Sequence, residues 1–140
     1  MDKIPDTTAL VARWIEKAMH DLGIAEVLIN DQHPYNDGIC FHCQQAVEKM
    51  LKAALVFMEI EFKKSHDLTY LADLLSEKMQ ISEEFYEQLE ILEDYAVEIR
   101  YPDSTSDPTL EEAKEAIDIV KKIQRKLNDI FSPIGIKFKI

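Results

Sequence analysis

Hydrophobic side chains recur every three or four positions along most of the chain, a spacing that predicts amphipathic helices. The longest of these runs, residues 38–62, predicts a central helix, because apolar residues cover most of its circumference and need several neighbouring helices to bury them. Its polar residues form a narrow seam that we expect to face solvent: Gln45, Glu48, Lys49, Lys52 and Glu59. On that seam, Glu48 and Lys52 are spaced for an i,i+4 ion pair.

Four other helices are predicted from the same periodicity, over residues 10–29, 68–79, 83–99 and 110–130. The segments between them are short, which favours antiparallel packing of neighbouring helices. The sequence therefore predicts an all-α fold, an antiparallel up-and-down bundle of about five helices. We expect a single domain with its core at about residues 10–131.

Polar residues and prolines next to these runs predict where the helices begin. Ser65 and Ser82 are the expected N-caps of the third and fourth helices, and Asp107 is the expected N-cap of the last, with Pro108 in its first turn. In the tail, residues 132–140, apolar and polar residues alternate, which predicts a short extended segment or strand.

The composition is typical of one globular domain, with 46% hydrophobic and 31% charged residues in a chain of 140. The first residues lack the pattern of a signal peptide and no apolar run is long enough to span a bilayer, which predicts a soluble protein without membrane contact. Two cysteines in such a chain predict free thiols in the cytoplasm. The net charge of −11 argues against broad, non-specific binding to nucleic acid but is compatible with a local basic site.

Cys40 and Cys43 form a CxxC pair with His42 between them, which on a helix permits a metal or redox role. A structural zinc site needs four ligands, and the sequence holds no second pair of cysteines. Both cysteines also fall on the apolar face of the central helix, where a thiol acts as a small hydrophobic group. We therefore expect core thiols and no metal site.

The fourth predicted helix carries a run of acidic residues on the face opposite its apolar one: Glu83, Glu87, Glu90, Asp94 and Glu98. Such a run is usually a solvated helix face. The alternative interpretation is a docking surface for a basic partner.

Three polar residues next to predicted helix ends are candidates for a site. Asp67 in a first helical turn is favoured by the helix dipole, so it has a structural explanation, whereas His66 either binds a neighbouring helix or contacts a ligand. Arg100 stands beside an aromatic residue and a proline at a helix C-terminus, where a cation is favoured in any case. Its functional interpretation is a planar cation that binds phosphate or carboxylate.

These residues fall within segments in which the chain resembles the HEPN domains, a family named for nucleotide binding in higher eukaryotes and prokaryotes. The resemblance extends from about Trp14 to Phe131. The segments that carry it are Ala18 to Ala25, Phe41 to Lys49 followed by Leu51-Lys52-Ala53, His66-Asp67-Leu68, and Tyr95 to Asp103 around Arg100-Tyr101-Pro102.

The resemblance implies a bundle of about five helices that often forms homodimers. Members commonly form a complex with a small nucleotidyltransferase, described as a toxin–antitoxin pair, and many are metal-independent ribonucleases with an Arg followed after four to six residues by a His. This chain departs from that ribonuclease motif, because Thr105, Ser106 and Asp107 stand where the His is expected after Arg100. A Thr or Ser hydroxyl cannot replace an imidazole in proton transfer near neutral pH.

The sequence therefore predicts a non-catalytic module, without a cofactor, that binds a nucleotide, a nucleotidyltransferase partner or both. The residues assigned to this binding are Gln45, Lys49, Lys52, His66, Asp67, Arg100 and Tyr101. The alternatives are a ribonuclease toxin with an altered site made of Arg100 and His66, and a purely structural subunit. Tyr95 and Tyr101 are candidate targets if the partner modifies this chain.

Overall fold

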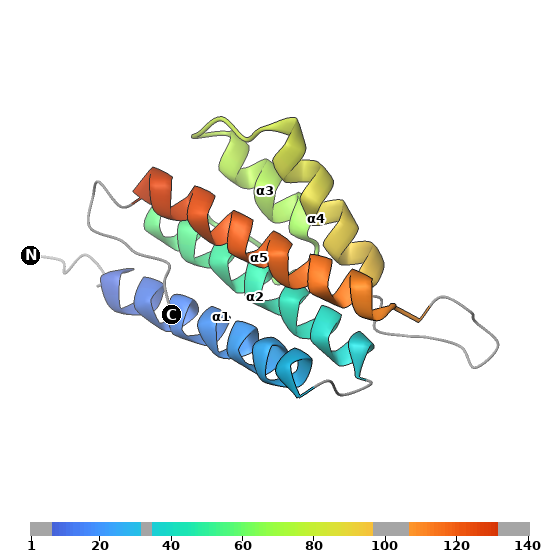
Figure 1. The fold of residues 1–140 in the computed structure, drawn as a ribbon. Coiled ribbons are helices and arrows are strands. Elements are labelled where there is room, and N and C mark those ends of the chain that lie inside the picture. Colours follow the sequence, from blue (N-terminus) through green and yellow to red (C-terminus); the bar gives the residue numbers. More distant parts are fainter. Residues whose placement is uncertain (1–6, 32–34, 97–106, 132–140) are drawn as a thin grey trace, which may run out of the picture.

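The computed structural model describes residues 7–31, 35–96 and 107–131, and every regular element within these ranges is a helix (Figure 1). The helices are α1 (Thr7–Asn30), α2 (Asn36–Phe57), α3 (Leu68–Ser76), α4 (Glu83–Tyr95) and α5 (Leu110–Phe131). The predicted all-α fold of five helices is confirmed. The predicted extended segment at residues 132–140 lies outside the described residues. Within the described ranges, no helix combines the length and apolar character that spanning a bilayer requires.

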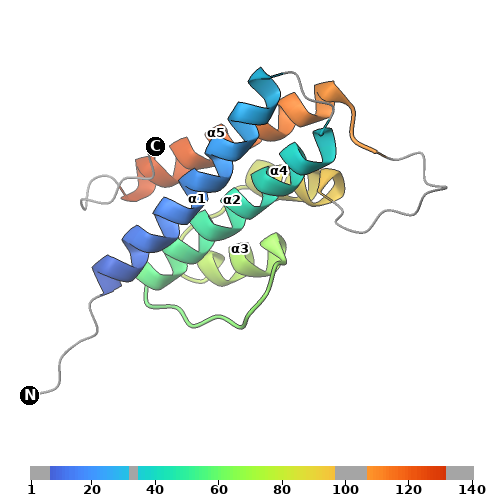
Figure 2. The same ribbon diagram turned by 90° about the horizontal axis from the view of Figure 1, so that it is seen from below.

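The helix α2 lies at the centre of the bundle and contacts each of the other four. Seen from below, α1 and α2 cross the molecule side by side, and α3 lies against another side of α2 (Figure 2). The colours in Figure 1 show that α1 runs antiparallel to α2, whereas α5 returns along α2 in the same direction. This parallel return is possible because the two short helices α3 and α4 carry the chain back to the starting end.

Burial on several sides of α2 confirms its predicted central position. Twelve of its 22 residues are buried, and the ten apolar ones among them form the largest part of the core shared by all five helices. Cys40 and Cys43 are among them, fully buried and not joined by a disulfide. Burial raises the pKa of the Cys43 thiol, because a thiolate would lose its hydration there. Both thiols therefore act as packing groups, as predicted.

Side-chain caps fix the starts of three helices, and two of these caps differ from those predicted. Ser82 accepts a hydrogen bond from the backbone N–H of Phe85 and caps α4 as expected. The cap of α3 is Asp67 and not Ser65. The last helix begins after Thr109 and not after Asp107, because Thr109 and Glu112 form a capping box in which each side chain binds the other residue's backbone N–H.

The helix α2 also ends earlier than predicted, at Phe57 and not near residue 62. The N–H of Glu59 donates to the carbonyl of Val56 and the N–H of Ile60 to that of Leu55, which is the hydrogen-bond pattern of a Schellman motif. In that motif Glu59 takes a positive φ of 57°, the conformation that usually selects glycine. Because no Gly or Pro marks this position, the sequence pattern continued through it.

The strained position of Glu59 leads to a stability prediction. Replacing it with glycine should raise the free energy of unfolding by up to about 1 kcal/mol, because relief of the left-handed strain exceeds the added entropy of the unfolded chain. Urea denaturation monitored by circular dichroism measures this change. The matched control is Glu61→Gly, an exposed position without a positive φ, which should be neutral or destabilising. An equal effect at both positions would contradict the explanation.

Candidate functional site

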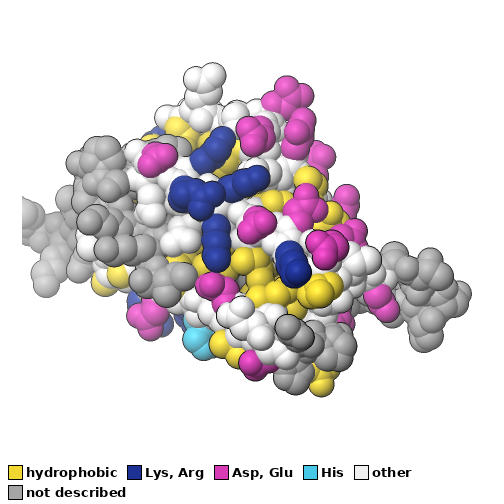
Figure 3. Space-filling model, in the orientation of Figure 1, with side chains coloured by type: hydrophobic (Ala, Val, Ile, Leu, Met, Phe, Trp, Pro, Cys, Tyr) yellow, Lys and Arg dark blue, Asp and Glu magenta, His cyan; other side chains and the backbone are white. Residues whose placement is uncertain are grey.

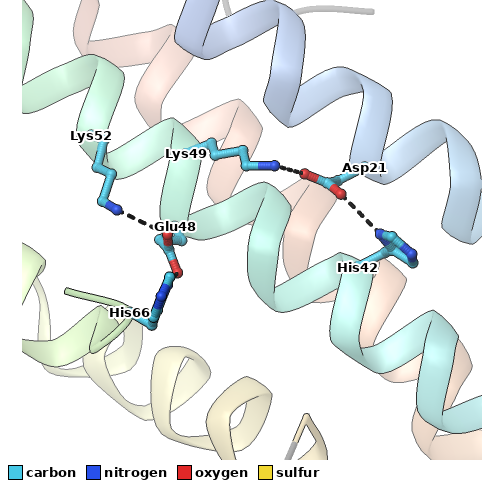
Figure 4. A network of polar contacts seen from close by, with 6 residues as sticks. All are labelled: Asp21, His42, Glu48, Lys49, Lys52 and His66. Atoms are coloured by element: carbon cyan, nitrogen blue, oxygen red, sulfur yellow. Dashed lines mark hydrogen bonds and ion pairs between the residues drawn. The ribbon is translucent and has the colours of Figure 1, made fainter. Parts of the chain in front are cut away.

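The polar seam of α2 is not exposed as predicted, because two of its charged residues are buried in the bundle. Glu48 is 3% and Lys52 7% exposed, and Asp21 of α1 is 5% exposed. A buried charge is destabilising unless it is paired, so each of these groups needs a partner. Figure 4 shows two separate networks that supply the partners, one toward α1 and one toward the segment before α3.

The first network is built around the carboxylate of Glu48. Its Oε2 accepts from Nζ of Lys52 at 2.9 Å, and its Oε1 accepts from Nδ1 of His66 at 2.9 Å (Figure 4). The ammonium of Lys52 also lies 5.5 Å from the ring centre of Trp14 and 6.0 Å from that of Phe62. Both aromatic faces stabilise a desolvated cation. The network thus satisfies two buried charges and leaves His66 at its outer edge.

His66 lies between α2 and α3 and presents its imidazole to solvent, since its side chain is 82% exposed although one ring nitrogen is bound to Glu48. Its backbone is fixed as well, because Gln44 Nε2 donates to the His66 carbonyl at 3.0 Å and the next residue, Asp67, caps α3. A carboxylate on Nδ1 sets the tautomer in which Nε2 of the neutral ring is an acceptor. His66 is therefore an oriented side chain that can accept or transfer a proton.

A cleft of about 230 Å³ adjoins His66. The residues that line it come from α2, α4 and the segment before α3: Phe41, Gln44, Gln45, His66, Glu93 and Ala96. Among the described residues, no group donates a hydrogen bond to the buried Oε1 of Gln45. Partial burial and the neighbouring charge of Asp67 raise the pKa of Glu93, whose carboxylate accepts from Thr69 Oγ1 at 3.3 Å. The cleft thus combines an aromatic ring, two amides, an imidazole and a carboxyl group.

The second network is centred on Asp21 and lies on the α1 side of α2. The Asp21 carboxylate binds Nδ1 of His42 at 2.9 Å and Nζ of Lys49 at 2.5 Å (Figure 4). Lys49 also lines a shallow cleft of about 320 Å³, together with Glu16, Lys17 and His20 of α1. Because Lys49 Nζ binds Asp21 of α1, the lysine stabilises the packing of α1 against α2. Lys49 is not among the residues that line the cleft beside His66.

The structure brings together only part of the residues assigned to binding from the sequence. Gln45 and His66 line one cleft, and Lys52 reaches that site only through Glu48. Asp67 caps α3, and Lys49 binds Asp21. Arg100 and Tyr101 lie outside the described residues. In the described part of the chain, no three His, Cys, Asp or Glu side chains are grouped as metal ligands would be.

Sequence reasoning missed the structural importance of Asp21 and Glu48, although a signal for each is present. Asp21 falls on the apolar face of α1, between the buried residues Ala18 and Leu22. Glu48 lies within the densest apolar run of the chain. A charged residue in such a position is buried with a partner or breaks the helix face, so each position carried a signal for a paired carboxylate that the prediction did not use.

The Glu48 network leads to a stability prediction. Glu48→Ala should lower the free energy of unfolding by about 3–5 kcal/mol, because it leaves the buried ammonium of Lys52 without its counter-charge. The double variant Glu48→Leu/Lys52→Met should regain most of that loss, since it removes both charges and keeps the volume. Urea denaturation provides the comparison, with exposed Glu90→Ala as the control expected within about 0.5 kcal/mol of wild type. Equal, small effects of Glu48→Ala and Glu90→Ala would contradict this account of the network.

A second prediction concerns Tyr95, at the C-terminus of α4, whose hydroxyl donates to Glu115 of α5 at 2.5 Å. That hydrogen bond, followed by burial and the Glu115 charge, raises the pKa of Tyr95 from 10.0 to about 12. The folded state therefore favours the neutral phenol, and this stabilisation is complete below pH 10 and disappears as the pH rises to about 12. Titration of tyrosinate absorbance should show a step near pH 12 that Tyr95→Phe removes. In Glu115→Gln that step should move toward pH 10, and a step unchanged by either variant would exclude the assignment.

Comparison with known proteins gives three similarities. The family model described as HEPN domain matches residues 11–130 of this chain. A protein of Methanocaldococcus jannaschii named "Putative toxin MJ1304" is 29% identical over 131 residues, which cover 83% of this chain and 84% of that protein. The crystal structure of ST0689, described as an archaeal HEPN homologue, matches with a TM-score of 0.67 and 23% identity, covering 86% of this chain and 96% of that one. At that identity the likeness concerns the fold.

Proposed function

The chain belongs to the HEPN domain family, and we propose that it is the binding module of a toxin–antitoxin-like pair. In this proposal it binds a nucleotide, a small nucleotidyltransferase partner or both, as a homodimer in the cytoplasm, and it catalyses no reaction itself. The proposal of a toxin–antitoxin-like pair is supported by the relative named as a toxin, whose alignment covers most of this chain. The proposal of a bound nucleotide is supported by the cleft beside His66.

The acceptor of Gln45, which has no donor among the described residues, is the observation that carries the proposal of a ligand. A buried amide oxygen without a donor costs about 1–3 kcal/mol, so the site gains when a ligand supplies an N–H group. Nucleobases carry such donors on their edges. The oxygen itself is buried, but its residue lines an open cleft, so a ligand that enters from solvent reaches it when the Gln45 amide turns toward the cleft.

The other residues of the cleft have the chemistry that a nucleotide requires. Phe41 provides an aromatic surface on which a base can stack, and His66 adds a group that donates or accepts a hydrogen bond. Ala96 also lines the cleft, and Arg100 follows it four residues later in the sequence. We propose that Arg100, with Tyr101 beside it, binds the phosphates, because a guanidinium forms paired hydrogen bonds with phosphate oxygens.

The Glu48–His66 contact favours a second candidate, a metal-independent ribonuclease that uses His66. A carboxylate that orients an imidazole through Nδ1 is the arrangement in which histidine acts as a general base or acid. Arg100 would then stabilise the negative charge that develops on the phosphate. The absence of a histidine four to six residues after Arg100 in the sequence keeps binding as the first choice.

Nucleotide binding by the cleft can be measured by calorimetry with ATP, GTP, CTP and UTP. We expect one nucleotide to bind preferentially, and Gln45→Leu, His66→Ala and Arg100→Ala each to weaken its binding by about tenfold or more, the loss of one good hydrogen bond or ion pair. The control is Gln80→Leu, the same substitution at an exposed position between α3 and α4. Equal weakening by the control, or no binding of any nucleotide by the wild type, would exclude the cleft as a nucleotide site.

Incubation of the wild type with mixed cellular RNA in EDTA separates the two candidates. A binding module leaves the RNA intact. Cleavage that disappears in both His66→Ala and Arg100→Ala would establish the ribonuclease instead.

A further inference from the structure

The C-terminal half of α5 carries a concentrated positive charge on a protein whose net charge is −11. Four basic residues fall within six positions: Lys121, Lys122, Arg125 and Lys126. In Figure 3, Lys and Arg side chains gather over this part of α5, and Asp and Glu side chains are concentrated toward α3 and α4. We call these four residues the α5 basic surface.

Contacts within the described part of the chain use only part of this charge. Lys121 Nζ lies 3.5 Å from a carboxylate oxygen of Glu26 in α1, and Lys126 Nζ lies 3.5 Å from the hydroxyl of Ser82. Lys122 and Arg125 are exposed and have no hydrogen bond or ion pair within the described residues. Two adjacent cations on one helix face are thus available to an external anion.

The helix dipole does not explain the position of the α5 basic surface. Cations gain from the dipole only within about the last turn of a helix, and the last turn of α5 contains no basic residue. The four cations instead lie one turn or more before the end, where like charges face each other at i,i+4 and the exposed Asp118 and Asp129 offset only part of their repulsion. Because like charges at this spacing are destabilising, they indicate a function outside folding.

The neighbours of the α5 basic surface define the size of the anion that fits it. Residues 121 to 126 span about 7.5 Å along the helix axis, and Asp118 and Asp129 are exposed just before and after them. A long phosphate backbone would extend onto these acidic residues, and residues 121–126 include no aromatic side chain on which a base could stack. A compact group of two or three carboxylates on a folded surface fits between them, and a partner's own cations can pair with Asp118 and Asp129.

We propose that the α5 basic surface is a docking site for an acidic surface of a partner protein. Arg125 binds a carboxylate through its planar fork, Lys122 binds a second one, and the flanking aspartates fix the register by excluding misplaced carboxylates. The α5 basic surface shares no residue with the lining of the cleft beside His66, so this proposal does not depend on nucleotide binding.

Fluorescence anisotropy with three labelled probes tests this proposal. The probes are a helical peptide with Glu pairs at i,i+4, the same peptide with Gln in place of Glu, and a single-stranded oligouridylate. The wild type should bind the Glu peptide only, with an affinity that falls as salt is added. Lys122→Glu/Arg125→Glu should weaken that binding by about tenfold or more, the usual scale for loss of charge-assisted hydrogen bonds.

The control variant is Lys63→Glu/Lys64→Glu, which makes the same change in net charge at two exposed lysines before α3. It should leave binding of the Glu peptide within about twofold of wild type, because it keeps all four cations of the α5 basic surface, and surface charges outside the contact are weakened by salt screening. Equal weakening by both variants would mean that the net charge of the protein, and not the α5 basic surface, determines binding, and it would overturn the proposal. Failure of the wild type to bind the Glu peptide, or tighter binding of oligouridylate, would overturn it as well.

Discussion

A charge placed inside the bundle determines how the candidate site is built. The helix α2 is enclosed by the other four helices, so the polar side of that helix has no free access to water, and the carboxylate of Glu48 must find its partners in the protein. Lys52 neutralises it from the same helix, and His66 binds its second oxygen from the segment before α3. Because Lys52 binds only one of the two carboxylate oxygens, the buried Oε1 of Glu48 depends on His66 for its hydrogen bond, and the position of His66 is thereby coupled to the stability of the fold.

Most of the fold could be predicted from the sequence, because helical periodicity depends on which faces are buried. The five helices, the central position of residues 38–57 and the core thiols all follow from that pattern, and the match to the HEPN family confirms the resemblance. The pattern gave wrong helix boundaries where local hydrogen bonds determine the end of a helix. The Schellman motif at Glu59 ends α2 without a glycine. The capping box of Thr109 and Glu112 sets the start of α5, where the sequence predicted a cap at Asp107.

The site was harder to predict, because hydrophobic periodicity treats every charged residue as a surface residue. Glu48 and Lys52 were therefore assigned to an exposed seam, whereas their mutual pairing allows both to be buried. The same reasoning grouped Lys49 with Gln45, although its ammonium binds Asp21 on α1. Which carboxylate a lysine reaches depends on how α1 and α3 pack against α2, and that information is absent from the sequence of α2 alone.

The position of Trp14 gives the molecule an internal optical sensor. This residue is the sole tryptophan of the chain, and its ring centre lies 5.5 Å from the ammonium of Lys52. Lys52 binds Glu48, and Glu48 binds His66, so a chain of direct contacts connects the indole to the imidazole. Indole emission responds to the electric field of nearby charges. When excitation is chosen so that the five tyrosines do not absorb, the fluorescence of the protein comes from this one ring beside the buried network, so events at the outer imidazole can be followed without attaching a dye.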